Sequence, residues 1–189
     1  GSLLGSAIEH PAVGAWLDEV IPVLPSGIVD LDWLEKRLVT GKVSMVSVMA
    51  ANNETGVVQP VSEIHTLCKR FEVPYHCDAA QVFNRIEWTG TADFITLSGH
   101  KMGAPIGVGA LVLSQELPPL LKGGAQERGA RAGTVNAPLI DTWGHVIKSL
   151  RSMSQDAQRE LEVALTTATS AKIVGASAPR LPNTTLALF

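Results

Sequence analysis

The sequence of 189 residues lacks several features that define large protein classes. It has only two cysteines, Cys68 and Cys77, which excludes a disulfide framework and fits a reduced, intracellular protein. Its longest apolar run, Ala104–Leu113, is ten residues long and contains glycine and proline, so it is too short to span a bilayer. Residues 1–10 lack the basic start of a signal peptide. We therefore expect a cytoplasmic protein without a membrane partner.

An excess of positive charge is also lacking. The 15 basic and 18 acidic residues give a net charge of -3, and no basic block is present, which argues against a nucleic-acid partner. The chain is 46% hydrophobic and 17% charged, which excludes a disordered, collagen-like or coiled-coil chain and leaves enough apolar residues for a core. The length is typical of one domain with part of a second.

Hydrophobic patterning predicts an α/β fold. Short apolar segments predict buried strands at Leu3–Ile8, Val43–Ala50, Tyr75–Asp78, Phe94–Leu97 and Val108–Leu113. Helical periodicity predicts helices at Pro11–Val20, at Leu31–Leu38 after the capping Asp30, at Ile64–Phe71 and, as one long helix, at Leu139–Thr169. Strands that alternate with helices in this way favour a mainly parallel sheet flanked by helices.

Both ends of the sequence resemble cuts within a longer chain. The first residues, Leu3–Ile8, and the last, Leu181–Phe189, are apolar, whereas natural termini are usually polar and loosely held. We therefore expect a fold that is incomplete at both ends. Residues 1–160 would form part of a large domain, and residues 161–189 the end of the long helix and the start of a smaller C-terminal domain.

Polar residues follow the predicted strands. They occur at 52–56 (NNETG), 78–81 (DAAQ) and 98–101 (SGHK), and in the loop at 128–134 (RGARAGT). In an open parallel sheet, ligands bind at the carboxyl ends of the strands. An electron-sink cofactor needs a lysine that forms an imine, an acid that keeps a pyridinium nitrogen protonated, and neutral donors for a phosphate. The motifs supply this set, and we expect no metal site.

The order and spacing of five motifs resemble those of the cysteine desulfurases of the NifS/IscS type. The motifs are EHPAV at 9–13, NNETG at 52–56, HCDAAQ at 76–81, SGHK at 98–101 and RGARAGT at 128–134. These enzymes are class V, fold-type I enzymes that use pyridoxal 5'-phosphate (PLP). The resemblance covers nearly the whole chain, and it implies that residues 1–160 are part of the PLP-binding large domain.

The resemblance also implies roles for individual residues around the cofactor ring. Lys101 would be the imine-forming lysine, and His10 would stack on the ring and shuttle protons. Asp78 would pair with the pyridine nitrogen. Gln81 would hydrogen-bond the ring's 3-hydroxyl oxygen, and Asn53 would line the same side and help to orient the substrate.

The cofactor phosphate has its own implied set of donors. Ser98 and His100 would bind the phosphate within the chain, and Thr134 would bind the phosphate of a partner subunit, so the site would be completed across a homodimer. Arg128 and Arg131 would brace the loop that carries Thr134.

Elementary chemistry supports these roles. A carboxylate against the ring nitrogen favours the protonated, electron-withdrawing ring, and a lysine near that ring is a better nucleophile because its pKa is lowered. Imidazole moves protons near neutral pH. Structural alternatives remain for each residue: Lys101 as a surface lysine, Asp78 as a helix cap, His10 as a cap or packed histidine, and Asn53 as the end of a turn.

The implied reaction removes sulfur from L-cysteine to give L-alanine and an enzyme persulfide, for transfer to an acceptor or scaffold protein or for iron–sulfur cluster assembly. The family's N-terminal phosphate-binding pair, its persulfide cysteine and its substrate-binding arginine are absent here. We therefore expect these residues alone to be inactive. The alternatives are another class V enzyme, such as a selenocysteine lyase or an aminotransferase, and a non-catalytic fragment.

Overall fold

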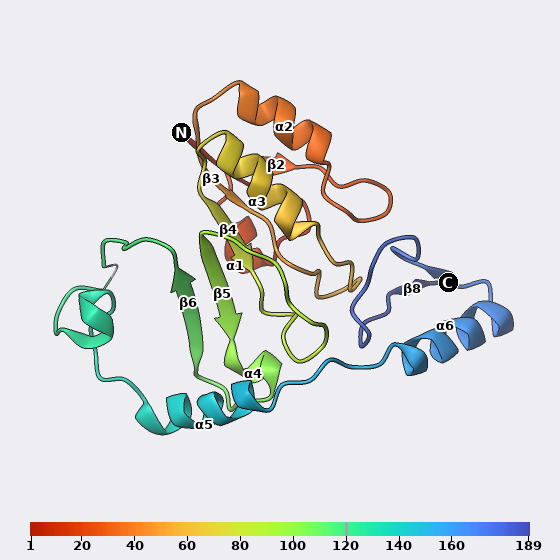
Figure 1. Cartoon of the computed structure of the whole chain (residues 1–189). Helices are drawn as coiled ribbons and strands as arrows, with labels where there is room; N and C mark the ends of the chain where they lie inside the picture. Colours follow the sequence, from red (N-terminus) through yellow and green to blue (C-terminus); the bar gives the residue numbers. More distant parts are fainter. Residues whose placement is uncertain (120) are drawn as a thin grey trace.

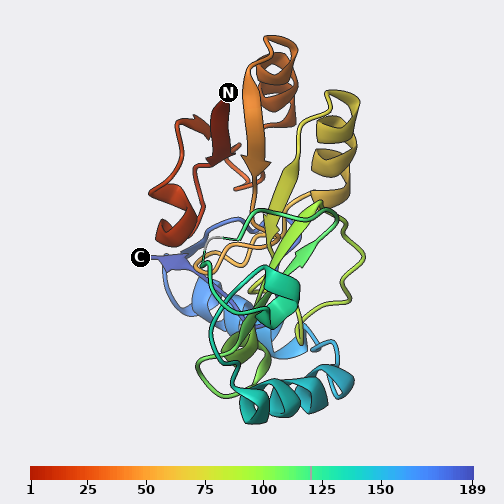
Figure 2. The same cartoon turned by 90° about the vertical axis from the view of Figure 1, so that its left-hand side faces the viewer.

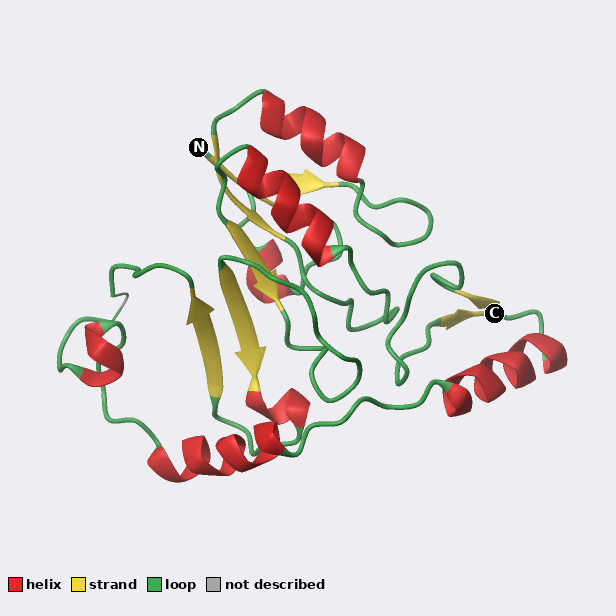
Figure 3. Cartoon of the chain, in the orientation of Figure 1, coloured by secondary structure: helices red, strands yellow, loops and turns green. Residues whose placement is uncertain are grey.

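The computed structural model describes residues 1–119 and 121–189. Its main feature is a six-stranded sheet in the order β2-β1-β3-β4-β5-β6 (Figures 1 and 3). Neighbouring strands from β2 to β5 are parallel, and β6 runs antiparallel to β5. The predicted α/β fold with a mainly parallel sheet is confirmed. The strands are β1 (Ser2–Ser6), β2 (Glu19–Ile21), β3 (Val43–Ser47), β4 (Tyr75–Asp78), β5 (Phe94–Ser98) and β6 (Gly109–Leu113).

Helices connect the strands and continue towards the C-terminus. They are α1 (Pro11–Gly14), α2 (Leu31–Val39), α3 (Val61–Arg70), α4 (Gly99–Met102), α5 (Ala137–Lys148) and α6 (Asp156–Ala168), with a 3-10 turn at Gln126–Gly129. In both Figure 1 and Figure 2, α2 and α3 lie side by side against the sheet, and α4 and α5 lie at the carboxyl end of β5. A separate two-stranded sheet, β7 (Lys172–Ile173) with β8 (Ala187–Leu188), lies near the C-terminus.

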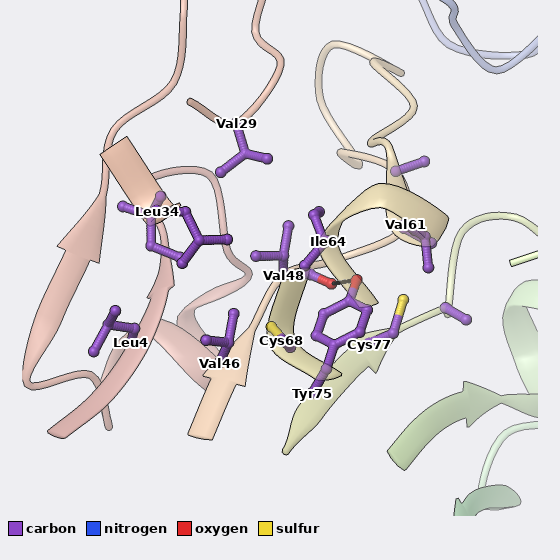
Figure 4. Packing of buried hydrophobic residues seen from close by; sticks show 14 of the residues in the cluster. Leu4, Val29, Leu34, Val46, Val48, Val61, Ile64, Cys68, Tyr75 and Cys77 are labelled. Carbon is purple, nitrogen blue, oxygen red and sulfur yellow. Dashed lines mark hydrogen bonds between the residues drawn. The ribbon is translucent and has the colours of Figure 1, made fainter. Parts of the chain in front are cut away.

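The core lies between the sheet and the helices α2 and α3 (Figure 4). Ile64 and Cys68 of α3 are fully buried and share a face because they are four residues apart. The Tyr75 ring packs beneath them, and its hydroxyl donates to the Val48 carbonyl at 3.0 Å. Each large side chain buried in this way contributes about 1.5–3 kcal/mol. This packing holds the carboxyl ends of β3 and β4 in place.

The helix predicted at Pro11–Val20 is wrong beyond its first turn. The structure has only α1, and the chain returns as β2 beside β1. Asp18 holds the returning chain beside β1, because its Oδ2 accepts the Leu3 N–H at 2.8 Å. Gly14 lowers the helix propensity, and Trp16 is exposed rather than part of an apolar stripe.

The single helix predicted at Leu139–Thr169 is also wrong, because residues 149–155 separate α5 from α6. The Met153 N–H donates to the Arg85 carbonyl at 2.9 Å, and the Arg151 N–H to Asn84 Oδ1 at 3.3 Å. The Ser149 hydroxyl donates to the Val146 carbonyl and so competes with the helical backbone bonds. Contacts distant in sequence therefore interrupt a pattern that is locally helical. The domain division at residue 160 stays a prediction.

Candidate functional site

The parallel strands bring the predicted site residues to one edge of the sheet. β1, β3, β4 and β5 end at this edge, and their pairing keeps the ends in step: the Ala50 N–H donates to the Asp78 carbonyl at 2.8 Å, and the Ala79 N–H to the Thr96 carbonyl at 3.0 Å. His10 follows β1, Asn53 follows β3, Asp78 ends β4, and Lys101 follows β5.

One carboxylate oxygen of Asp78 accepts a backbone hydrogen bond, and the other oxygen is free to bind a ligand. Its Oδ1 accepts the Ala80 N–H at 2.9 Å, which turns the chain away from the sheet. Its Oδ2 has no hydrogen bond among the described residues. Turns rather than a helix follow Asp78, so its interpretation as a helix cap is wrong. A half-buried carboxylate with one free oxygen can face a cationic ring nitrogen.

The segment after β5 carries Ser98, His100 and Lys101. Ser98 Oγ lies 3.1 Å from His100 Nδ1, so the hydroxyl and the imidazole form one polar pair. Lys101 is exposed and forms no salt bridge within residues 1–119 and 121–189. Gly99 is required here, because a Cβ at this position would come within 2.9 Å of the Val108 carbonyl oxygen.

His10 caps α1, as one of its structural alternatives predicted. Its Nδ1 accepts the Ala12 N–H at 3.2 Å, which fixes the ring at the end of β1. The side chain is exposed, and Nε2 has no hydrogen-bond partner among the described residues. Capping and proton transfer are compatible, because they use different ring nitrogens.

Asn53 is exposed, and its neighbour Asn52 shapes the loop that carries it. The buried Asn52 Oδ1 accepts the Glu54 and Thr55 N–H groups at 3.0 and 2.8 Å, and its Nδ2 donates to the Ile8 carbonyl at 3.1 Å. Asn52 thus joins the chain after β3 to the chain after β1. Its position in the NNETG motif was the sequence signal for this turn.

Gln81 and Thr134 differ in how the structure places them. Gln81 is half-buried in the turns after Asp78, and its carbonyl accepts from Arg85 Nη1 at 2.7 Å. Thr134 is exposed and lines a hollow of about 870 Å³ with Arg128 and Arg131, but Asp78, Ser98, His100 and Lys101 do not line that hollow. The other site residues follow the strand ends, whereas Thr134 lies in the loop that lines this hollow, which also borders Gly109, the β6 partner of Ser98.

Sequence reasoning missed Glu9. Its Oε1 accepts from Ser6 Oγ at 2.5 Å and from the Met49 N–H at 2.8 Å, whereas Oε2 is enclosed without a partner among the described residues. Burial, with a smaller effect from the charge of Asp78, raises the pKa of Glu9 to about 7. Only its place in the EHPAV motif could have drawn attention to it, because its burial depends on a residue 40 positions away.

Sequence reasoning also missed a set of side-chain hydrogen bonds that links β3, β4 and β5. The His76 ring lies between two hydroxyl groups, with Nδ1 2.8 Å from Ser47 Oγ and Nε2 2.8 Å from Thr96 Oγ1. His76 is two residues before Asp78 on β4, so both side chains are on the same face of the sheet. Burial lowers the pKa of His76, against the opposing effect of the Asp78 charge. The His76 ring, on the same face of β4 as Asp78, is therefore neutral.

The thiols of Cys68 and Cys77 are poorly suited to act as nucleophiles. Cys68 and Cys77 are free and buried, and burial raises the pKa of each to about 12. A nucleophilic thiolate needs the opposite environment.

Within the described ranges, no group of three or more metal-ligating side chains is present. No helix in the same part of the chain has both the length and the apolar character that crossing a membrane requires.

The side chains at the sheet edge fit a phosphorylated pyridine aldehyde. Asp78 offers a free carboxylate oxygen for a ring nitrogen, Lys101 an unpaired amine for an aldehyde, and Ser98 with His100 a pair of donors for a phosphate. The donor set therefore matches the chemistry that the sequence motifs predicted.

Comparisons with known proteins now decide the family. The model of the aminotransferase class-V family matches residues 13–185. The chain belongs to this family. It is 42% identical to the cysteine desulfurase IscS of Rickettsia typhi over 73% of this chain and 35% of that protein.

Solved structures agree with this assignment. A NifS-like protein from Rickettsia africae superposes with a TM-score of 0.91 at 35% identity, covering 99% of this chain and 57% of that one. SspA in complex with cysteine superposes with a TM-score of 0.85 at 30% identity, covering 100% of this chain and 58% of that one. The chain thus spans about a third to somewhat more than half of these proteins. The class-V family and its cysteine desulfurases are PLP-dependent.

Proposed function

We propose that the protein carrying this chain is a PLP-dependent cysteine desulfurase and that these residues form much of its cofactor site. The proposal is carried by one observation: an acid and a lysine lie at the ends of two neighbouring strands. Asp78 ends β4 with one free oxygen, and the unpaired Lys101 follows β5. PLP supplies an electron sink that weakens bonds at the substrate Cα.

The residues of this chain would hold the cofactor and move protons. Lys101 would bind the aldehyde carbon, and Asp78 would keep the ring nitrogen protonated. Gln81 and Asn53 would approach the ring from the side. His10, through its free Nε2, would hold or deliver a proton.

The phosphate would be bound by Ser98 and His100, whose side chains already form a pair. Thr134 would serve a partner subunit in a homodimer. Its exposed side chain supports that role.

L-Cysteine is the proposed substrate, supported by the neighbour solved in complex with cysteine. The balanced reaction is L-cysteine plus an enzyme thiol giving L-alanine plus an enzyme persulfide. The buried Cys68 and Cys77 are unsuited to accept sulfur, so the thiol would come from outside these residues. The persulfide would then pass to an acceptor or scaffold protein, including one for iron–sulfur cluster assembly. Free thiols suit a reducing compartment, which supports a cytoplasmic location.

Borohydride reduction of the complete protein with PLP tests the site. The expected result is one phosphopyridoxyl label on Lys101, found by peptide mass spectrometry, together with loss of L-alanine production in Lys101→Ala. Lys36→Ala, which changes an exposed lysine on α2, is the control and should retain both label and activity. Labels spread over surface lysines would contradict the proposal.

A further inference from the structure

A second, smaller hydrophobic cluster includes the residue that directly follows Lys101. Its buried members are Met102, Ala104 and Trp143, and partly buried side chains that include Leu97 of β5 pack around them. Trp143 lies in the middle of α5, so the cluster joins α4 to α5 at the carboxyl end of β5 (Figure 1). The proposed function assigns no role to Met102 or to Trp143.

Met102 anchors the short helix that carries Lys101. The helix α4 has only four residues, and a helix of that length is not stable through its own backbone bonds. His100 and Lys101 are exposed, and Gly99 is buried but has no side chain. Met102, which is 2% exposed, therefore supplies the side chain that holds α4 in the interior. The position of the Lys101 backbone depends on this one residue.

Trp143 fixes the position of the Met102 side chain. Its Nε1 donates to Met102 Sδ at 3.3 Å, and both side chains are buried. An indole N–H can only donate and usually has a partner when it is buried, and a thioether sulfur is a weak acceptor. Methionine is unbranched and adapts to irregular gaps, so packing alone would not select one rotamer. The bond from the indole makes that selection.

The Met102 backbone is held from the other side of the site. Asn84 lies in the turns after Asp78, and its Nδ2 donates to the Met102 carbonyl at 3.4 Å. Asn84 Oδ1 accepts the N–H of Arg151, which follows α5, at 3.3 Å. Met102 is thus held both by α5 and by the segment that follows β4. Because the exposed Lys101 forms no ion pair in the part of the chain that the structure describes, we infer that the backbone sets its position.

We propose that Trp143 is a positioning residue for the reaction of Lys101 with PLP: through its bond to Met102, it holds the backbone of α4 so that the Lys101 amine reaches the cofactor aldehyde. This inference rests on the proposed function, in which Lys101 forms the imine. In that step the neutral amine adds to the aldehyde carbon, a carbon–nitrogen double bond forms, and the aldehyde oxygen leaves as water. The rate depends steeply on alignment, since a misplacement of about 1 Å can cost about 100-fold.

Stopped-flow absorbance on the complete protein, stripped of PLP, measures the rate of imine formation at saturating PLP. Trp143→Phe removes the indole N–H but keeps an aromatic ring, and Met102→Leu removes the sulfur but keeps a similar volume. We expect each change to slow imine formation about tenfold. The double variant should be no slower than the slower single variant, because both changes remove the same bond. Trp33→Phe, the same change at a half-buried tryptophan on α2, is the control and should match the wild type.

Pyridoxine 5'-phosphate, which has the ring and phosphate of PLP but no aldehyde, separates positioning from a general loss of structure. Its Kd should be the same in all variants, because it does not react with lysine. Wild-type rates in Trp143→Phe and Met102→Leu, independent effects in the double variant, or equally weakened binding of pyridoxine 5'-phosphate would overturn the role of Trp143 and leave the proposed function standing. If Trp143→Phe does not fold, Met102→Leu alone decides. Failure of the wild type to form the imine would overturn both.

Discussion

The imidazole of His76 shows how one residue can order a sheet edge. Its two nitrogens occupy the space between Ser47 on β3 and Thr96 on β5, and a neutral ring can donate to one hydroxyl and accept from the other. A protonated ring could donate to both hydroxyls, so burial rather than the bonding pattern favours the neutral ring. The ring supports the strand that ends in Asp78.

We expect this neutrality to make stability depend on pH. The folded pKa of His76 lies below its ordinary value of 6.5, so the unfolded chain binds more protons, and stability is complete above pH 6.5 and falls as the pH drops through the folded pKa. His76→Leu should lose about 1–3 kcal/mol at neutral pH, because two hydroxyls lose their partner. It should also flatten the acid side of the profile. Urea unfolding of the complete protein from about pH 5 to pH 8 measures both, and an unchanged acid slope relative to wild type would contradict the prediction.

At this scale, sequence motifs located the polar residues at the strand ends but not their partners. Asp78 and Lys101 could be predicted because each follows an apolar strand in a recognisable motif. The enclosed carboxyl of Glu9 could not, because it depends on Met49 and Asp78, which are distant in sequence and become neighbours only through strand pairing. Residue type predicts possible chemistry, whereas burial decides the protonation state.

At the scale of helices and strands, the carboxylate of Asp93 joins α3 to β4. Asp93 lies outside the motifs found in the sequence. Asp93 is buried just before β5; its Oδ1 accepts from Lys69 of α3 at 2.6 Å and its Oδ2 accepts the Tyr75 N–H at 2.9 Å. Burial alone would raise the pKa of Asp93, but the bonds to Lys69 and Tyr75 outweigh it and lower that pKa. The ionised form therefore holds helix and strand together.

Asp93→Ala should lose about 1–3 kcal/mol of unfolding free energy, because a buried backbone N–H and a lysine lose their acceptor. The wild-type contribution is present above the ordinary pKa of 3.8 and is lost as the pH falls through the lower folded value. Chemical denaturation of the complete protein at neutral and acidic pH tests this. Glu63→Ala on α3 is the control, and an equal effect of both changes would refute the role of Asp93.

The helix boundaries show what local sequence patterns can and cannot predict. The helix α3 was predicted well, because its apolar stripe faces the sheet and Ile64 and Cys68 are fully buried. The single helix predicted over α5 and α6 failed, because backbone bonds to Asn84 and Arg85 outweigh local helix propensity. Periodicity records which face is apolar, but not where a distant segment interrupts the backbone.

In the molecule as a whole, the C-terminal segment supports the loop that carries Asn53. The Leu181 N–H donates to the Gly56 carbonyl at 2.8 Å, and the Val58 N–H to the Pro179 carbonyl at 2.8 Å. Gly56 has a φ of 74°, and a Cβ there would lie 3.0 Å from Thr184. Residues about 125 positions apart in sequence thus form one structural unit, which local sequence patterns could not predict.

A largely buried ion pair fixes that segment to α6. Both guanidinium Nη atoms of Arg180 lie 2.6 Å from the Glu162 carboxylate, and Thr185 Oγ1 donates to the same carboxylate at 2.6 Å. The two charged side chains are only 10% and 16% exposed. Bidentate pairing in a mostly dry setting makes the loss of one partner costly, because the other charge stays buried.

Arg180→Ala should therefore lose about 2–4 kcal/mol of unfolding free energy and loosen the loop that carries Asn53. Hydrogen exchange of the complete protein should become faster at the Val58 and Leu181 amides, whose bonds join the loop to the C-terminal segment. Arg159→Ala, an exposed position on α6, is the control and should leave both amides protected. Equal exchange rates in the two variants would show that the ion pair stabilises only its own helix. Faster exchange in Arg180→Ala alone would mean that the C-terminal segment holds the candidate site in place.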